Sequence, residues 1–173
     1  MNKALVAIIA ASDSDLPIIS EAIKVLEEFA VPYEITISSA HRSPQKTVEF
    51  VENAHKNGVK IIIAGASLAA HLAGVVASHF PLPVIGIPLK SGALNGNDAL
   101  FATVQMPPGI PVATVGIDNA KNAGLLAVQI LAVSNQQLEE KLIAYKKKQA
   151  ETIEQKSEKL EKIGYQKYLD ERS

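Results

Sequence analysis

The chain has 173 residues, of which 47% are hydrophobic and 20% are charged, and its formal net charge is −1. This length favours one domain that buries roughly 70% of its unfolded surface, and the composition excludes a disordered protein. The charge gives no reason to expect a nucleic-acid or anionic-membrane partner. Without cysteine there is no disulfide and no thiolate metal ligand. The apolar residues 4–11 are too few to span a bilayer, so we expect a cytoplasmic protein.

Short apolar runs alternate along the chain with amphipathic segments. The first amphipathic segment repeats Ile19, Ile23 and Leu26 at helical spacing, and the third repeats Leu68, Leu72 and Val76. Short apolar runs are predicted as strands over residues 4–10, 59–64, 83–88 and 111–115, and the alternating residues 33–38 are predicted as a further strand. Strands that are apolar throughout need cover on both faces, which is typical of a parallel sheet between two helical layers. The fold class expected is therefore α/β, a three-layer α/β/α sandwich of flavodoxin-like or Rossmann-like type.

The C-terminal part of the chain differs from the rest. Residues 135–163 are rich in charge and carry a thin apolar stripe: Leu138, Leu142, Tyr145, Ile153, Leu160 and Ile163. So narrow a stripe on so long a helix suits an arm laid across a neighbouring subunit, and a solvated helix with frayed ends is the alternative. We expect a catalytic α/β domain over residues 1–134 and a helical arm over residues 135–173.

Ligands of such sheets bind at the carboxyl ends of the strands. Ser12 and Asp15 follow the first strand, where hydroxyls and free N–H groups can bind an anion or merely cap a helix. After the second strand, His41 can give and take a proton near neutral pH, and Arg42 offers a planar fork for phosphate or carboxylate. Ser43 is expected to cap a helix that begins at Pro44.

Small residues follow the third strand, in the segment 65–74, and would let a ligand approach the backbone. By its spacing, His71 falls inside the third helix, where a structural role is the simpler interpretation. Residues 90–98 and 105–111 read as a loop and a rigid bend that can lie over a pocket. The sequence has no Walker loop, dinucleotide fingerprint, nucleophile elbow or metal-ligand spacing, so no cofactor or metal is expected.

Together and in this order, these segments are specific. Ser12-x-Ser14-Asp15, Ser39-Ala40-His41-Arg42-Ser43-Pro44, Gly65-Ala66-x-x-Ala69-Ala70-His71-Leu72 and Gln105-Met106-Pro107-x-Gly109-Ile110-Pro111 occur in one chain. The pattern resembles the N5-carboxyaminoimidazole ribonucleotide mutase family of purine biosynthesis over nearly the whole chain. That resemblance implies conversion of N5-carboxyaminoimidazole ribonucleotide to 4-carboxyaminoimidazole ribonucleotide without a metal or organic cofactor. It also implies a homo-octamer with shared active sites and a functional link to the synthetase that makes the substrate.

The resemblance also implies roles for residues of this chain. His41 would be the general acid and base, and Ser12, Asp15 and Arg42 would hold the ribonucleotide, with Arg42 on its phosphate. The base and carboxylate pocket would be lined by Ser39, Gly65, Ala66, Ser67, Ala70, His71 and Leu72. The chain departs from the family pattern at Ala11, at Ser67-Leu68 in place of Gly-Gly, at Ala73 and at Ala99.

Two alternatives stay open. The related animal-type branch carboxylates aminoimidazole ribonucleotide directly with carbon dioxide; Arg42 and His71 favour the mutase, whereas the lost Gly-Gly keeps the direct carboxylase open. A receiver-like signalling domain would need an acceptor Asp at the end of the third strand, where this chain has Gly65.

Overall fold

The structure is a computed structural model that describes residues 3–171. The chain divides into two compact units, Met1–Leu131 and Ala132–Ser173. Among the described residues, no helix is both long and apolar enough to cross a membrane.

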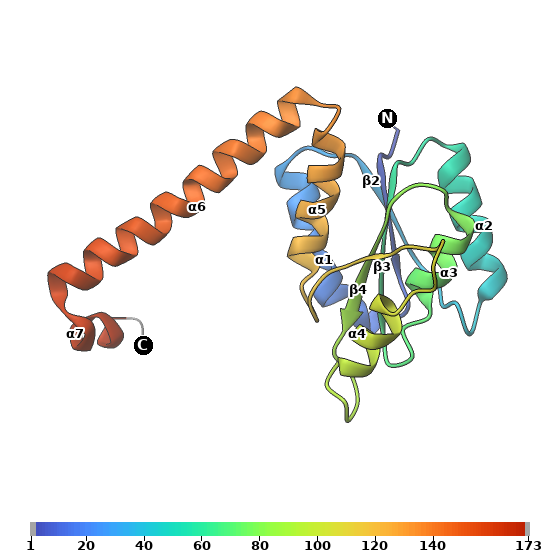
Figure 1. The fold of residues 1–173 in the computed structure, drawn as a ribbon, viewed down its shortest axis with the longest axis horizontal. Coiled ribbons are helices and arrows are strands. Elements are labelled where there is room, and N and C mark those ends of the chain that lie inside the picture. The colour runs from blue at the N-terminus through green and yellow to red at the C-terminus, as the bar shows by residue number, and fades with distance from the viewer. Residues whose placement is uncertain (1–2, 172–173) are drawn as a thin grey trace. The chain divides into compact units, whose positions relative to one another are not determined.

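The first unit is built on a parallel five-stranded sheet with the order β2-β1-β3-β4-β5 (Figure 1). The chain runs from β1 to β2 on one side and then to β3 on the other, so the strand order reverses beside β1. This confirms the predicted fold class. The strands are β1 (Val6–Ala10), β2 (Tyr33–Ile37), β3 (Ile61–Ser67), β4 (Val84–Leu89) and β5 (Ala113–Thr114).

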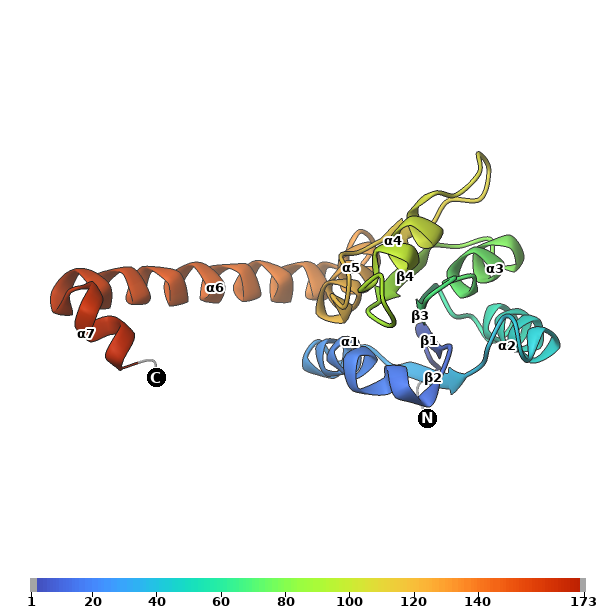
Figure 2. The ribbon, with the colours of Figure 1, turned by 90° about the horizontal axis from the view of Figure 1, so that it is seen from below.

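Helices cover both faces of this sheet. Figures 1 and 2 show α1 and α5 on one face and α2 and α3 on the other. On the second face, Ala7 and Ile9 of β1 share a buried cluster with Val51 of α2 and Val76 of α3. On the first face the packing is so close that a Cβ on Gly65 would lie 2.7 Å from Cδ1 of Ile19. The helices of this unit are a 3₁₀ turn, η1 (Asp13–Asp15), then α1 (Leu16–Glu28), α2 (Pro44–Lys56), α3 (Leu72–His79), α4 (Asn97–Val104) and α5 (Ala120–Ala132).

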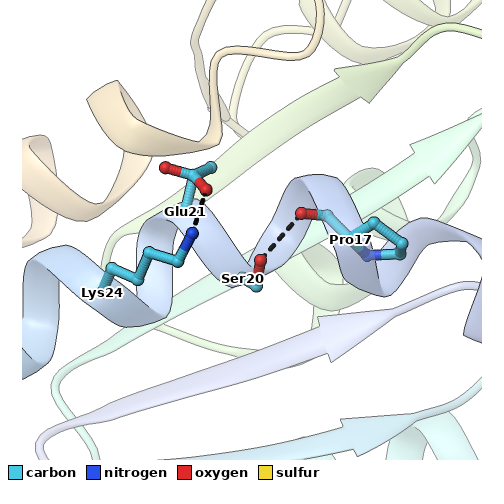
Figure 3. Close-up of polar contacts among 4 residues, drawn as sticks. All are labelled: Pro17, Ser20, Glu21 and Lys24. Atoms are coloured by element: carbon cyan, nitrogen blue, oxygen red, sulfur yellow. Dashed lines mark hydrogen bonds and ion pairs between the residues drawn. The ribbon is translucent and has the colours of Figure 1, made fainter.

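Helix α1 shows how the pattern of apolar residues produces this layer. Its buried residues include Ile19, Ala22 and Leu26, which recur at helical spacing. Its other face is polar: Lys24 pairs with Glu21, and Ser20 Oγ donates to the carbonyl oxygen of Pro17 at 2.7 Å (Figure 3). Helix α1 therefore contributes core packing, while the residues just before it contribute to the site.

The structure differs from the sequence-based predictions at several places. Strand β3 runs to Ser67, whereas the predicted strand ends at Ala64, because the pairing with β4 continues to Ser67 and Leu89. Helix α3 begins at Leu72 rather than at Leu68, because Leu68 has a φ of +55°, which no α-helix accepts. Residues 97–104 form α4, where the predicted loop takes in Asn97 and Asp98 and no helix was expected. Strand β5 has two residues, Ala113–Thr114, although five were predicted.

The second unit consists mainly of the long helix α6 (Gln136–Ile163) and the short helix α7 (Tyr165–Asp170), and α6 confirms the predicted C-terminal helix. Asn135 caps α6 by accepting a hydrogen bond from the N–H of Leu138 at 3.2 Å. The helix ends at Gly164, whose φ is +75°. Several apolar side chains of this unit are exposed, namely Ile143, Ile153, Leu160, Tyr165 and Leu169.

Candidate active site

The loop that carries His41 is fixed by hydrogen bonds of the serines on either side of it. Ser39 N–H donates to Ser43 Oγ at 3.0 Å, and Ser43 N–H donates to Ser39 O at 2.8 Å. The Ser39 hydroxyl accepts from Arg42 N–H at 3.2 Å. Ser43 stands at the N-cap position of α2 but makes no side-chain cap, which corrects the prediction, because its hydroxyl binds Ser39 instead. The loop therefore presents His41 and Arg42 to solvent on a closed backbone turn.

Two buried hydroxyls attach this turn to α2. Ser38 and Thr47 are 2% and 0% exposed, and their hydroxyl oxygens lie 2.8 Å apart. Thr47 Oγ1 also donates to Ser43 O at 3.3 Å, and Ser38 N–H donates to Ala10 O at 2.9 Å. The His41 loop is thus anchored both to the adjacent strand β1 and to the helix that follows.

His41 and His71 are brought together from different loops. Their rings stack with centroids 4.9 Å apart and an interplanar angle of 29°. His71 is the N-cap residue of α3 and is exposed, so it lies one position outside the helix in which spacing placed it. Two groups that can carry a proton near neutral pH therefore lie in contact at the carboxyl edge of the sheet.

A depression of about 520 Å³ lies between the ends of β1 and β2; Arg42, the neighbour of His41 in sequence, lines it, but neither histidine does. Arg42 Nη2 donates to the carbonyl oxygen of Ala11 at 3.4 Å and so reaches across it. Ser12 and Ser14 hydroxyls lie 2.9 Å apart at the start of η1. The residues that line the depression are Ala11, Ser12, Asp13, Ile37, Ser38, Ser39, Arg42 and Ser43. A guanidinium, hydroxyls and free N–H groups are the donors that bind a phosphate.

Asp13 occupies two of these donors in the free chain. Its Oδ1 accepts from Ser12 Oγ and from Ser14 N–H, both at 3.0 Å. The hydrogen bond from Ser12 is the main reason why the pKa of Asp13 lies below its usual value. An anion that binds these two donors would displace the carboxylate of Asp13. The sequence alone does not predict that Asp13 holds these donors, because an aspartate at this position is equally typical of a helix cap.

Asp15 is the buried acid of the site. It is 7% exposed, and its Oδ2 has no hydrogen-bond partner among the residues that the structure describes. Burial raises the pKa of its carboxyl group above the usual value. Such an oxygen is suited to accept a hydrogen bond from a ligand hydroxyl, because that bond would relieve its desolvation.

The residues that the sequence predicts for the pocket after the third strand are mostly buried. Ala66, Ala70 and Leu72 are buried, and the side chain of Leu72, 1% exposed, packs in the core. Gly65 lies inside β3, and its carbonyl oxygen accepts from Ala11 N–H at 3.0 Å.

Ser67 is half-buried and opens a turn closed by a hydrogen bond of 3.1 Å from Ala70 N–H to Ser67 O. This turn brings His71 to His41 and leaves Leu68 exposed, a residue that the sequence interpretation assigned to a helix.

Two further observations concern the rest of the described chain. A second depression, of about 620 Å³, lies at the amino edge of the sheet between residues 77–84 and 109–113. Its lining is mostly apolar, so we place the chemistry at the carboxyl edge, where the proton carriers and anion donors meet. Across residues 3–171, no group of three His, Asp or Glu side chains is arranged to hold a metal ion.

The family model described as AIR carboxylase matches residues 5–152 of this chain. The chain belongs to this family. It is 56% identical over 170 residues to the N5-carboxyaminoimidazole ribonucleotide mutase of Pyrococcus horikoshii, which covers 98% of this chain and 96% of the relative. It is 51% identical to the phosphoribosylaminoimidazole carboxylase of Saccharomyces cerevisiae, over 98% of this chain but 30% of that protein. The crystal structure of Treponema denticola PurE matches with a TM-score of 0.83 and 27% identity, covering 94% of this chain and 99% of the other.

Proposed function

We propose that this chain is an N5-carboxyaminoimidazole ribonucleotide mutase, an isomerase of purine biosynthesis that forms 4-carboxyaminoimidazole ribonucleotide. The observation that carries the proposal is the stack of His41 on His71 at the same edge of the sheet as a depression lined by Arg42 and by Ser12. The end-to-end match to a protein named as this mutase supports the same reaction.

Substrate binding follows from the groups at the carboxyl edge. The phosphate of the ribonucleotide binds Arg42 and the hydroxyl and N–H groups that Asp13 holds in the free chain. A ribose hydroxyl donates to the unpartnered Oδ2 of Asp15. Ser39 and the backbone of residues 65–70 face the base and its carboxylate. The base then reaches the two histidines.

The first half of the reaction breaks the bond between N5 and the carboxylate carbon. His41 in its imidazolium form donates a proton to N5, and the electrons of the breaking bond stay on nitrogen. The products are carbon dioxide and aminoimidazole ribonucleotide. His41 is left neutral and ready to act as a base.

The second half forms a new bond at C4. The electron-rich ring carbon attacks carbon dioxide, so C4 briefly carries both the new carboxylate and its original hydrogen. Neutral His41 removes that proton, which restores the aromatic ring and the imidazolium. Holding the two reactants at near-attack distance supplies the main rate advantage, since no metal or external acid takes part in this scheme. The proton that His41 donates in one step is replaced in the next.

The second candidate is the direct carboxylation of aminoimidazole ribonucleotide by carbon dioxide, which the change to Ser67-Leu68 keeps open. One assay separates the two reactions: the chain is incubated with N5-carboxyaminoimidazole ribonucleotide, or with aminoimidazole ribonucleotide and bicarbonate, and product absorbance is followed. Turnover of the first substrate at low bicarbonate supports the mutase. Turnover of the second mixture alone contradicts it.

The assembly and cellular setting belong to the same proposal. We expect a cytoplasmic homo-octamer in which residues 135–173 lie on a neighbouring subunit and the active sites draw on more than one chain. The exposed apolar side chains of α6, such as Ile143 and Ile153, support that role for the arm. The enzyme would act directly after the synthetase that forms the labile carbamate.

A further inference from the structure

Leu68 has a backbone conformation that its side chain disfavours. It is the second residue of the turn over residues 67–70, and its φ is +55°. No other residue of that turn has a positive φ, so the turn resembles type II′, which favours glycine at this position. A bulky residue there lowers stability, and such strain is typically found at functional sites.

Burial within the chain offsets only part of this strain, because about half of the Leu68 side chain is exposed. The side chain of Leu68 is 51% exposed, whereas Leu72 and Leu89, which lie close to it in sequence or strand register, are each 1% exposed. A turn with glycine would be more stable in the free protein. The leucine therefore gains less from burial in the isolated chain than its neighbours Leu72 and Leu89 do.

The side chain does have a defined position. Its Cδ2 lies 3.1 Å from the point that a Cβ on Gly92 would occupy, in the loop after β4. Strand β4 lies on the side of β3 that faces away from β1. Leu68 therefore extends from the carboxyl end of β3 toward the loop after β4, whereas Arg42 and the depression that it lines lie at the ends of β1 and β2.

We propose that Leu68 is a specificity-determining residue: its side chain forms the apolar wall that retains carbon dioxide beside the turn over residues 67–70. This inference rests on the proposed mutase function. Free carbon dioxide is neutral, so charge and hydrogen bonds hold it weakly, and enclosure must keep it near C4. Once formed, it either bonds to C4 or escapes and leaves aminoimidazole ribonucleotide behind. Bound substrate would bury Leu68 and supply the apolar contact that the free chain lacks.

The test follows the fate of the carboxyl carbon. The protein receives substrate labelled with carbon-13 in the carbamate, in excess unlabelled bicarbonate, and mass spectrometry gives the labelled fraction of the 4-carboxy product. Leu68→Ala removes the side chain and keeps the strained φ, Leu68→Gly removes both, and Leu68→Met keeps an apolar side chain of similar volume. Leu82→Ala is the matched control, an exposed leucine beside the amino edge of the sheet.

We expect the unchanged protein, Leu68→Met and Leu82→Ala to retain the label. In Leu68→Ala and Leu68→Gly the ratio of escaped to transferred label should rise at least about tenfold, the effect of removing methylenes from an apolar site. Leu68→Gly should also melt about 2–4 °C above Leu68→Ala, because only glycine is unstrained at this φ. Melting temperature thus reports the backbone strain of the turn, while label retention reports the loss of the apolar side chain, so the two effects of Leu68 are measured separately.

Three results would overturn the inference: label retention in Leu68→Ala and Leu68→Gly equal to that of Leu82→Ala, equal loss in Leu68→Met, or complete exchange in the unchanged protein. Failure of the proposed function is a different observation, since the unchanged protein would then form no 4-carboxy product from this substrate. A folded Leu68→Gly protein keeps the test decisive even where Leu68→Ala is unstable.

Discussion

The imidazole ring of His41 lies 4.9 Å from that of His71, centroid to centroid, and the two planes meet at 29°. One ring comes from the loop after β2, and the other from the N-terminal end of α3. The stack therefore makes the orientation of one histidine depend on the presence of the other.

Replacing His71 tests this dependence. His71→Ala should lower kcat by about 2–12-fold, because a stacked aromatic pair contributes about 0.5–1.5 kcal/mol. His71→Phe keeps a ring that can stack and should restore most of that loss. Steady-state kinetics separates the effects, since a positioning role changes kcat more than KM. Equal losses of kcat in the two variants would show that His71 acts through its nitrogens instead.

Replacing His41 tests the proton transfer itself. His41→Asn should reduce kcat by about 10²–10⁴-fold, the usual contribution of general acid and base catalysis. Binding of an unreactive ribonucleotide, measured by calorimetry, should change little because Arg42 and Asp15 remain. A rate that stays within about tenfold of the parent would exclude His41 as the proton carrier.

Much of this site could be predicted from the sequence, because apolar runs define the strands and the carboxyl ends of parallel strands share one edge. That argument puts Ser12, His41 and Arg42 just after the carboxyl ends of β1 and β2, where the structure has them, while their roles stay a prediction. The predicted α3 boundary was wrong, because the spacing of Leu68 and Leu72 suits a helix, whereas Leu68 has a φ of +55° in a turn closed by the hydrogen bond from Ala70 N–H to Ser67 O. Helix α4 has eight residues and lies within a segment whose glycines and asparagines favour a loop. In both segments the secondary structure depends on tertiary packing, which local sequence patterns do not show.

The buried acid makes stability depend on pH. Burial raises the pKa of Asp15, so the folded chain holds this proton more tightly than the unfolded chain. Stability from this group is complete below its usual pKa of 3.8 and is lost as pH rises through the raised value. Asp15→Asn should therefore stabilise the protein at pH 7 by about 1 kcal/mol, although it weakens substrate binding. Urea unfolding at pH 7 and near pH 3.5 measures the gain, which should shrink at the lower pH.

Asp13, two residues before Asp15, is the matched control. The pKa of Asp13 is lowered by hydrogen bonds, so its ionised form stabilises the fold at neutral pH and Asp13→Asn should bring no gain there. If both variants are stabilised equally at pH 7, general repulsion among acids is responsible rather than the burial of Asp15.

The C-terminal arm can be tested by its effect on assembly. A chain that ends at Asn135 should sediment as a smaller particle than the full chain, because the apolar side chains of α6 would be missing. Ile153→Asp, at a side chain that is 63% exposed, should weaken assembly in the same direction. Lys148→Ala, on a different face of α6, serves as the control. An unchanged sedimentation profile for the truncated chain would rule out the arm as an assembly element.

The bond between Ser38 and Thr47 has a consequence for how this family can change over time. Both hydroxyls are buried and lie 2.8 Å apart. Losing one of them leaves its partner only a longer contact with Ser43, which lies 3.3 Å from either hydroxyl. That loss costs about 0.5–1.5 kcal/mol, whereas replacing both with apolar groups of similar shape is nearly neutral. Each single step between these two states is therefore selected against. Among homologues, the two positions should vary as a pair, and lineages that exchange one should carry the compensating exchange at the other.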